Sequence, residues 1–315
     1  MYPLKLKPAV KDFIWGGDNL KKNWNKESSS DIIAESWEVS CHKEGPSIID
    51  NGEYRGFSLS DFIKMHPDAI GKNASVFEFF PILIKLIDAK TSLSIQVHPS
   101  DEYALKNENQ YGKTEMWYVV DCKEGAGVYC GLNKKLSKQQ LKEDLEKGTI
   151  LDDLKFIKVN KGDCIFIPSG TIHAICGGLL IYEVQQNSSL TYRLFDYNRV
   201  DKNGNKRELH INKSLDVVNL DSISEKNSTV KVVDMYEKSL AECKYFKTRE
   251  LLINGDREEK LTRDSFVTVT VVSGQGEVIL DGNKESLKLG DSVFIPAEDS
   301  KYILKGNMVV IETRV

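Results

Sequence analysis

The sequence predicts a mainly β protein built from two related β-barrels in tandem, with a few helices. Short apolar or alternating runs such as LSIQVHP, MWYVVDC, LLIYEVQQ and SFVTVTVVSG are bounded by Gly, Pro, Asp or Lys, as is typical of strands. A second observation is an internal repeat, in which residues 161–173 (KGDCIFIPSGTIH) are echoed by residues 289–301 (LGDSVFIPAEDSK). Each copy combines a Gly-Asp turn, a buried strand and a Pro-led turn. Chance similarity of two short hairpins is the alternative explanation.

A polar stretch separates the two predicted units. Residues 221–228 (DSISEKNS) have the composition of a linker or loop. We therefore expect a first domain over residues 1–228, with N-terminal strands and short helices, and a second domain over residues 229–315. Two segments have helical spacing of apolar residues, 58–65 and 136–154, and each has a serine that can cap its start.

Composition excludes several classes of partner. With 43 basic and 47 acidic residues the formal net charge is −4, so nothing favours nucleic acid, and an anionic substrate would need a local cationic pocket. The N-terminus lacks the apolar region of a signal peptide, and no run is long enough to span a bilayer. The cysteines are scattered without a CxxC pair, as expected of reduced thiols. We expect a cytoplasmic protein without membrane or nucleic-acid partners, either a monomer or a weak homodimer.

Four residues of the first predicted domain have the order and chemistry of an open metal site. Gln96 and His98 are two residues apart, so they share one face of a strand. Glu115 begins another strand, and His173 ends the repeated hairpin. Two imidazoles and one carboxylate from three neighbouring strands can bind a metal ion and leave room for water or substrate. Each residue alone is more often a surface or hydrogen-bonded side chain, so the hypothesis depends on their order.

Three basic residues near these segments have competing interpretations. Lys85 lies inside the apolar strand ILIKLIDA, where it either meets a buried partner or points outward by alternation. Arg193 can form a structural ion pair with Asp196 or face a ligand. Lys113 follows a glycine and is ordinarily a solvated loop residue.

Residues 162–173 match the second cupin motif, and residues 96–115 resemble the first, with Gln96 in place of the usual first histidine. Together with FPILIKLIDAKTSLSIQVHPSDEYA, IAESWEVS, YGKTEMWYV and YEVQQNSSLTYRLFDY, these motifs look like the type I mannose-6-phosphate isomerase (phosphomannose isomerase) family in its short bacterial form. The resemblance covers most of residues 1–200. The C-terminal part resembles the second, metal-free cupin domain of that family. The implied fold is two tandem cupin (jelly-roll) barrels.

The resemblance also implies a set of site residues. It implies one zinc ion held by His98, Glu115 and His173, with Gln96 as the fourth ligand. Arg193 and Lys113 match further active-site positions of the family. Lys85 and Ser94 match positions proposed to hold the substrate phosphate, for which lysine and hydroxyl donors are well suited.

The implied reaction interconverts mannose 6-phosphate and fructose 6-phosphate through an enediol(ate). Arg193 would support the enediolate or contact the phosphate, and Lys113 is a candidate general acid/base, with a metal-bound water as the rival base. The sequence departs from longer family members in two places. Ser189 stands where they often have an acidic residue, and Gly112 stands where they often have histidine. These departures leave the identity of the base open.

The second predicted domain has no equivalent set of ligands. Lys301 occupies the position that answers to His173, and no histidine follows His210. Rival interpretations of the first domain are a non-haem iron oxygenase, which uses a similar ligand set, and a non-catalytic sugar-binding cupin. Gln96 and the set of Lys85, Ser94 and Arg193 favour a sugar phosphate. Substrate breadth among hexose phosphates, and zinc against another divalent metal, stay open.

Overall fold

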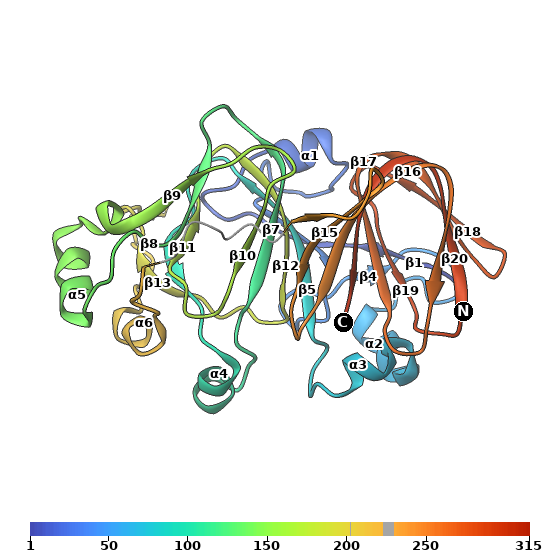
Figure 1. Cartoon of the computed structure of the whole chain (residues 1–315), viewed down its shortest axis with the longest axis horizontal. Helices are drawn as coiled ribbons and strands as arrows, with labels where there is room; N and C mark the ends of the chain where they lie inside the picture. Colours follow the sequence, from blue (N-terminus) through green and yellow to red (C-terminus); the bar gives the residue numbers. More distant parts are fainter. Residues whose placement is uncertain (202, 223–229) are drawn as a thin grey trace. The chain divides into compact units, whose positions relative to one another are not determined.

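The computed structural model describes residues 1–201, 203–222 and 230–315 (Figure 1). Strands hold 44% of the residues and helices 16%, which confirms the predicted mainly β class. The chain divides into two compact units. The terminal unit comprises Met1–Lys11, Asp18–Leu86 and Thr229–Val315, and the central unit comprises Asp12–Gly17 and Ile87–Ser228. The predicted linker lies, from residue 223 onward, outside the described residues, so the boundary at 228 stays a prediction.

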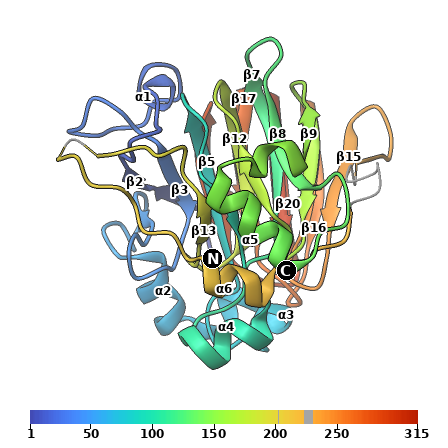
Figure 2. The same ribbon diagram turned by 90° about the vertical axis from the view of Figure 1, so that its left-hand side faces the viewer.

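The central unit contains two antiparallel sheets. One joins β10, β7 and β12, and the other has the strand order β13-β6-β11-β8-β9 (Figures 1 and 2). The strands are β6 (Ile95–Val97), β7 (Glu115–Cys122), β8 (Gly127–Leu132), β9 (Leu154–Lys158), β10 (Cys164–Ile167), β11 (His173–Ile175), β12 (Leu179–Gln186) and β13 (Tyr192–Phe195). The helices are α4 (Asp101–Glu108), α5 (Lys138–Lys147), the 3₁₀ helix η2 (Ile150–Asp153) and α6 (Ile211–Val217).

Strand β6 illustrates how alternation separates core from site. Ile95 and Val97 are fully buried in the apolar core of the five-stranded sheet, while Gln96 between them is only partly buried. In the antiparallel register, Gln96 pairs with His173 on one side and with Arg193 on the other. Since side chains of paired residues lie on the same face of a sheet, the strand order brings three predicted site residues together.

The terminal unit is dominated by one antiparallel sheet with the order β14-β15-β16-β20-β17-β19-β1-β4, and β18 pairs with β17. Strand β1 pairs with β19, so the N-terminal strand extends a sheet made largely of the last third of the chain. The elements are β1 (Leu4–Lys7), β2 (Ala9–Lys11), α1 (Asn19–Asn23), β3 (Glu35–Val39), β4 (Ile48–Ile49), α2 (Leu59–Met65), η1 (Pro67–Ile70), α3 (Gly71–Ser75), β14 (Lys231–Val232), β15 (Glu237–Glu242), β16 (Lys247–Leu261), β17 (Val267–Leu280), β18 (Asn283–Lys288), β19 (Ser292–Ile295) and β20 (Ser300–Arg314). Strand β5 (Ile82–Ala89) is divided between the two units after Leu86.

The two predicted helices are confirmed, with their caps. Ser58 precedes α2 and accepts a hydrogen bond from the backbone N–H of Asp61 at 3.0 Å. Ser137 precedes α5 and forms a capping box with Gln140. The predicted segment 136–154 is split because Gly148, at φ 74°, ends α5 in the left-handed conformation. Among the described residues no helix is both long and apolar enough to cross a membrane.

The internal repeat corresponds to the same turn built twice. Gly162 (φ 90°) and Gly290 (φ 86°) both take the left-handed conformation that glycine allows. In each copy the glycine N–H donates to a neighbouring strand, to Val119 O at 2.8 Å and to Val271 O at 2.9 Å, respectively. In each copy an aspartate follows the glycine, and its Oδ2 accepts a hydrogen bond from the backbone N–H three residues earlier. Asp163 accepts from Asn160, and Asp291 accepts from Lys288. The shared pattern argues against chance similarity of two hairpins.

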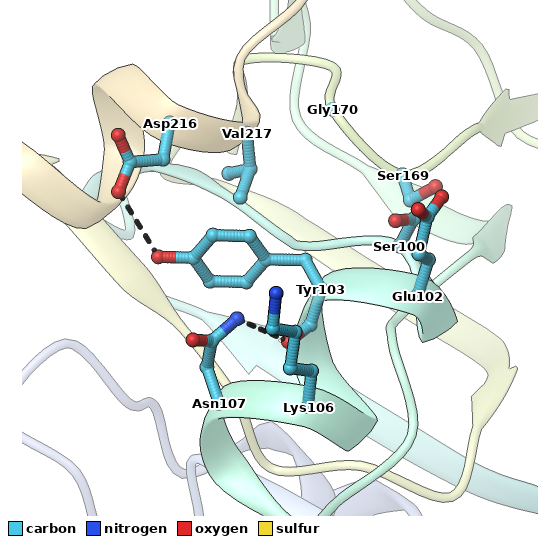
Figure 3. Close-up of a pocket in the computed structure, with 9 residues that line it drawn as sticks. All are labelled: Ser100, Glu102, Tyr103, Lys106, Asn107, Ser169, Gly170, Asp216 and Val217. Atoms are coloured by element: carbon cyan, nitrogen blue, oxygen red, sulfur yellow. Dashed lines mark hydrogen bonds between the residues drawn. The ribbon is translucent and has the colours of Figure 1, made fainter.

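Helices α4 and α6 border a cavity of about 480 Å³ in the central unit (Figure 3). Tyr103 stands in the middle of its lining, and its hydroxyl donates to Asp216 of α6 at 3.1 Å. Ser100 and Gly170 also line it, and they belong to the loops that follow β6 and precede β11. None of the predicted site residues is among its lining residues.

Candidate metal centre

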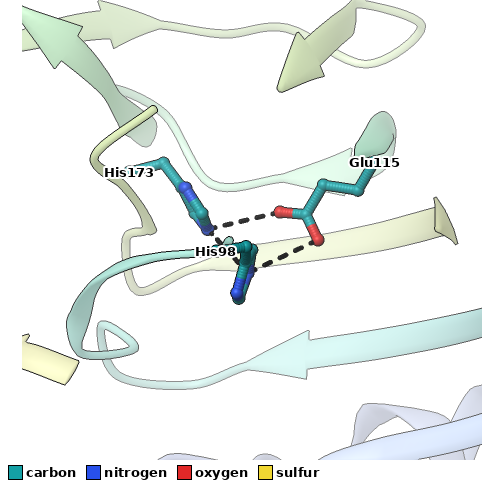
Figure 4. A group of neighbouring side chains, drawn as sticks. All are labelled: His98, Glu115 and His173. Atoms are coloured by element: carbon teal, nitrogen blue, oxygen red, sulfur yellow. Dashed lines mark hydrogen bonds and ion pairs between the residues drawn. The ribbon is translucent and has the colours of Figure 1, made fainter. Parts of the chain in front are cut away.

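Three side chains of the central unit converge on one point, and they are His98, Glu115 and His173 (Figure 4). All three are buried, and one ligand atom from each lies within 4.8 Å of the other two. Nε2 of His98 is 3.2 Å from Nε2 of His173. The Glu115 carboxylate oxygens lie 3.3 Å from Nε2 of His173 and 3.7 Å from Nε2 of His98. The structure therefore brings together the three ligands that the sequence predicts.

The ends of three strands position these ligands. His98 directly follows β6, Glu115 is the first residue of β7, and His173 is the first residue of β11. The backbone N–H of Gly170 donates to the carbonyl of His98 at 2.8 Å, which ties the two histidine-bearing loops together. Gly170 has φ 85°, a conformation that other residues rarely adopt. Gly170, which has Glu298 as its counterpart in the second copy of the repeat, thus has a direct part in building the centre.

The orientation of His173 is suited to metal binding. Its Nδ1 lies 2.8 Å from the carbonyl oxygen of Thr171, which can only accept a hydrogen bond. A proton on Nδ1 leaves the lone pair of Nε2 directed at His98 and Glu115. The ring of Trp117 packs edge-on against His173 at a centroid distance of 5.4 Å and limits its rotation.

The distances between ligand atoms test whether an ion fits. Atoms bound tetrahedrally at about 2.0–2.2 Å from one zinc ion lie about 3.3–3.6 Å from one another. The two imidazole nitrogens are 3.2 Å apart, and the carboxylate approaches His173 through Oε1 at 3.3 Å and His98 through Oε2 at 3.7 Å, all of which are close to that spacing. Two imidazole nitrogens and a carboxylate are also the donors that zinc and non-haem iron take. The donors present therefore fit one divalent ion.

Gln96 lies beside the three ligands. Its side-chain nitrogen is 3.3 Å from Nε2 of His173. The oxygen and nitrogen of a glutamine amide exchange places by a half-turn, so the amide oxygen can face the same point. This placement is compatible with the predicted fourth ligand, which stays a prediction.

Burial dominates the electrostatics of the centre. Desolvation raises the pKa of Glu115 to about 8, although Lys113 beside it acts in the opposite direction. Desolvation also lowers the pKa of His173 to about 4. The Lys113 ammonium lies 2.7 Å from Glu115 Oε2 and 3.2 Å from His98 Nε2. A cationic group is therefore drawn to the ligands, as a metal ion would be.

A further buried carboxylate, Glu183, was missed by the sequence reasoning. It lies on β12 with 2% of its surface exposed, and its Oε1 accepts a hydrogen bond from the Trp117 indole at 3.0 Å. Its carboxylate is also 3.9 Å from the Lys113 ammonium. The available signal was a charge inside the apolar run LLIYEVQQ, which is the signal that singled out Lys85.

Arg193 and Ser94 meet in the central unit. The guanidinium donates through Nε to the Ser94 hydroxyl at 3.3 Å and through Nη1 to the carbonyl of Glu208 at 2.8 Å. Asp196, the alternative partner, instead pairs with Arg199 and Arg207. Arg193 is half-buried, and desolvation lowers its pKa. A positively charged fork and a hydroxyl therefore lie together beside Gln96.

Lys85 lies in the part of β5 that belongs to the terminal unit. It is 7% exposed, so the outward-pointing alternative is wrong. Its ammonium is 3.4 Å from Glu35 and 5.3 Å from the ring centroid of Trp37. The partner that its burial requires is thus supplied by β3.

Gly112 has a steric reason for departing from the histidine of longer family members. A Cβ atom there would lie 2.4 Å from the carbonyl carbon of Ser100, 2.5 Å from the nitrogen of Asp101 and 2.6 Å from the carbonyl oxygen of Pro99. Backbone atoms cannot move aside as a flexible side chain can. Any side chain at this position would therefore displace the loop that follows His98.

Known proteins provide an independent comparison. Residues 3–126 match the family described as phosphomannose isomerase type I, catalytic domain, and residues 236–315 match the mannose-6-phosphate isomerase cupin domain. The chain is 38% identical over 307 residues to mannose-6-phosphate isomerase ManA of Bacillus subtilis, covering 96% of each chain. It is 34% identical to the mannose-6-phosphate isomerase of Streptococcus mutans, covering 98% and 97% of the two chains.

Solved structures agree with these relatives. The mannose 6-phosphate isomerase of Bacillus subtilis superposes with a TM-score of 0.91 at 35% identity, covering both chains completely. A phosphomannose isomerase of Salmonella typhimurium gives a TM-score of 0.82 at 17% identity, covering 99% of each chain, which indicates a shared fold. The full-length identity and the two matched domains establish that the chain belongs to the type I phosphomannose isomerase family.

Proposed function

We propose that the chain interconverts mannose 6-phosphate and fructose 6-phosphate with the help of one zinc ion. The observation that carries the proposal is the buried group of His98, Glu115 and His173, whose ligand atoms are spaced for a single ion. Full-length identity to proteins named mannose-6-phosphate isomerase supports the choice of substrate.

The ion would be held by the three convergent side chains, with Gln96 as the fourth ligand. When bound, zinc supplies a Lewis acid that polarises the sugar carbonyl and stabilises negative charge on its oxygen. Glu115 must then be ionised and His173 neutral, a state that the pKa values of the metal-free site give above pH 8 and that a bound cation would favour at lower pH.

The reaction requires a proton to move between C2 and C1 of the sugar through an enediol(ate). Lys113 is the candidate acid/base because its ammonium is buried within 3.2 Å of a metal ligand, His98, and within 2.7 Å of another, Glu115. The carboxylate of Glu183 lies 3.9 Å from the same ammonium. A base must lose its proton before it can accept one, so binding of the metal and sugar would have to release Lys113 from these contacts.

Arg193 and Ser94 would contact the negative charges of the substrate. A guanidinium offers several fixed donors to phosphate or enediolate oxygens, and its present partners, a hydroxyl and a backbone carbonyl, carry no net charge. Phosphate recognition by Lys85 rests on the family resemblance. Binding of the substrate phosphate to these residues would supply the energy that orients the reacting carbons.

We further infer that the fold consists of two cupin-like barrels in tandem, on the basis of the repeated turn and the cupin-domain match over residues 236–315. A cytoplasmic location and a monomeric or weakly dimeric state remain predictions. So does the absence of a metal from the C-terminal domain.

The test is an isomerase assay that couples the appearance of fructose 6-phosphate to a second enzyme. Mannose 6-phosphate should be converted, and glucose 6-phosphate and other aldose phosphates measure the breadth of the site. Oxygen uptake is followed in parallel, since an iron oxygenase would consume oxygen. Oxygen consumption without isomerisation would reject the proposal.

A further inference from the structure

Lys113 lies outside the sheet that fixes its neighbour Glu115. Glu115 begins β7 and is paired on both sides, with Ile167 of β10 and with Gln185 of β12. Lys113 precedes β7 by two residues and has no partner residue in either strand register. Something other than the sheet must therefore hold the lysine at the centre.

The backbone on either side of Lys113 is hydrogen-bonded to a side chain, one on each side. Asp101 accepts a hydrogen bond through Oδ1 from the N–H of Gly112 at 2.9 Å. Gln186 accepts one through Oε1 from the N–H of Thr114 at 2.8 Å. The Gln186 amide also donates to the same Oδ1 of Asp101 at 2.7 Å, so the two side chains form one continuous clamp.

The clamp is anchored to the elements that carry the rest of the centre. Asp101 is three residues beyond His98, and the N–H of Lys113 donates to Pro99 O at 3.0 Å. Gln186 is the last residue of β12, is 2% exposed, and donates from its own backbone to Thr114 O at 3.1 Å. The clamp thus joins the first residue of α4 to the last residue of β12, across the segment that presents Lys113.

The adjacent residue, Gln185, makes different hydrogen bonds. Gln185 donates to the carbonyls of Gln186 at 2.8 Å and of Ser188 at 2.7 Å, within its own turn. It therefore stabilises the turn that leads towards β13 and makes neither of the clamp contacts. A substitution of Gln186, unlike one of Gln185, therefore changes the contacts that hold the backbone beside Lys113.

We propose that the clamp of Asp101 and Gln186 is a positioning device, which sets the reach of Lys113 to the reacting carbons without touching the substrate. The proposal rests on the proposed isomerase function for its kinetic readout. Because Glu115 is held by the sheet, loss of the clamp should misplace the lysine and leave the metal site intact.

Gln186→Met removes both hydrogen bonds of the side chain while keeping its length. We expect kcat to fall about 10- to 100-fold, with KM for mannose 6-phosphate within about threefold and one zinc ion still bound per chain. Asp101→Ala should behave alike, whereas Asp101→Asn keeps the acceptor for Gly112 and should retain most of kcat. Gln139→Met, at an exposed position of α5, is the matched control.

A double-mutant cycle separates positioning from general damage. If Gln186 acts through Lys113, adding Gln186→Met to Lys113→Ala should lower the residual turnover no further. Independent, additive losses in the two variants would overturn the proposal, as would loss of zinc from Gln186→Met or an unchanged kcat.

Hydrogen exchange at the backbone N–H groups of Gly112 and Thr114 gives a readout that does not need the reaction. It should accelerate in Gln186→Met and Asp101→Ala and stay slow in Asp101→Asn. Absence of activity on mannose 6-phosphate in the wild-type protein would reject the proposed function. The exchange rates would still test whether the clamp holds the backbone beside Lys113. Unchanged exchange in all the variants would reject the clamp alone.

Discussion

Nε2 of His98 and Nε2 of His173 face each other across 3.2 Å in a fully buried setting. The hydrogen bond from Nδ1 of His173 to Thr171 leaves its Nε2 as an acceptor, and Nε2 of His98 has the Lys113 ammonium 3.2 Å away. Two nitrogen acceptors held this close repel each other unless one cation binds both of them. The arrangement is therefore one that a metal ion stabilises, and the pKa values of the ligands should govern its affinity.

Metal affinity should rise with pH. The pKa of Glu115 is raised to about 8, so its carboxyl group holds a proton at pH 6 that an incoming ion must displace. The apparent association constant for zinc should increase about tenfold per pH unit between pH 5 and 7 and level off near pH 8. Competition against a chelator of known affinity, after correction for its own protonation, measures this. An affinity independent of pH in that window would contradict the burial argument.

Metal removal should destabilise the protein more at pH 8.5 than at pH 5.5. A raised pKa for Glu115 means that the carboxyl's contribution to the stability of the metal-free fold is fully present below pH 4.5 and is lost as pH rises through about 8. His173, with a pKa lowered to about 4, contributes above pH 6.5 and loses that contribution as pH falls towards 4. Melting temperatures with and without chelator at both pH values give the test, and a larger loss at pH 5.5 would refute it.

Arg193→Ala should lower kcat by about 100-fold or more while leaving bound zinc unchanged, because the guanidinium would support developing charge and its hydrogen bonds go to Ser94 and Glu208 rather than to His98, Glu115 or His173. Steady-state kinetics and metal analysis of the same preparation check both parts. Arg263→Ala, at an exposed ion pair with Asp299, serves as the control and should be near wild type. Loss of zinc from Arg193→Ala would show a structural role instead.

Lys85 should contribute to substrate binding rather than turnover. Its removal alone would leave Glu35 without a buried cation, so the informative variant is the double substitution Lys85→Met with Glu35→Gln. We expect KM for mannose 6-phosphate to rise about tenfold or more, with a smaller change in kcat. Glu35→Gln alone is the matched control. An unchanged KM in the double variant would remove Lys85 from the phosphate site.

Gly112→Ala should reduce kcat with little loss of zinc. The added methyl group would lie about 2.5 Å from the backbone of residues 99–101, so the segment before β7 must shift and carry Lys113 with it. Kinetics and metal content again provide the measurement. Wild-type kcat in this variant would mean that the loop adjusts without moving the lysine.

Glu312 anchors a buried charge network in the terminal unit, where it pairs with Arg249 at 2.9 Å and with Arg314 at 2.8 Å. Burial alone would raise the pKa of Glu312, but the two arginines lower it overall. Its contribution to stability is therefore present above pH 4.5 and is lost as pH falls through the lowered value. Glu312→Gln should cost about 3 kcal/mol of unfolding free energy at pH 7, measured by urea denaturation. A cost below about 1 kcal/mol would contradict this.

The candidate metal ligands could be predicted because they belong to local patterns. Gln96 and His98 follow strand alternation, and His173 ends a glycine-aspartate hairpin whose geometry the structure reproduces. Each of these patterns can be recognised within about a dozen consecutive residues. The family motifs add the order in which the patterns follow one another along the chain.

Other parts depend on contacts distant in sequence. The pairing of Lys85 with Glu35 joins residues from different strands, so alternation alone left two orientations open. Glu183 and the clamp between Asp101 and Gln186 were not predicted, because their partners are set by strand register rather than by spacing. The pairing of β1 with β19 likewise brings together the two ends of the chain.

The most direct test of the metal centre is turnover of mannose 6-phosphate by chelator-stripped protein during titration with zinc. Activity should be absent at the start, rise in proportion to added zinc and saturate at one ion per chain, and His173→Ala should not respond. Full turnover by protein shown to be free of metal, or equal recovery in His173→Ala, would contradict the account.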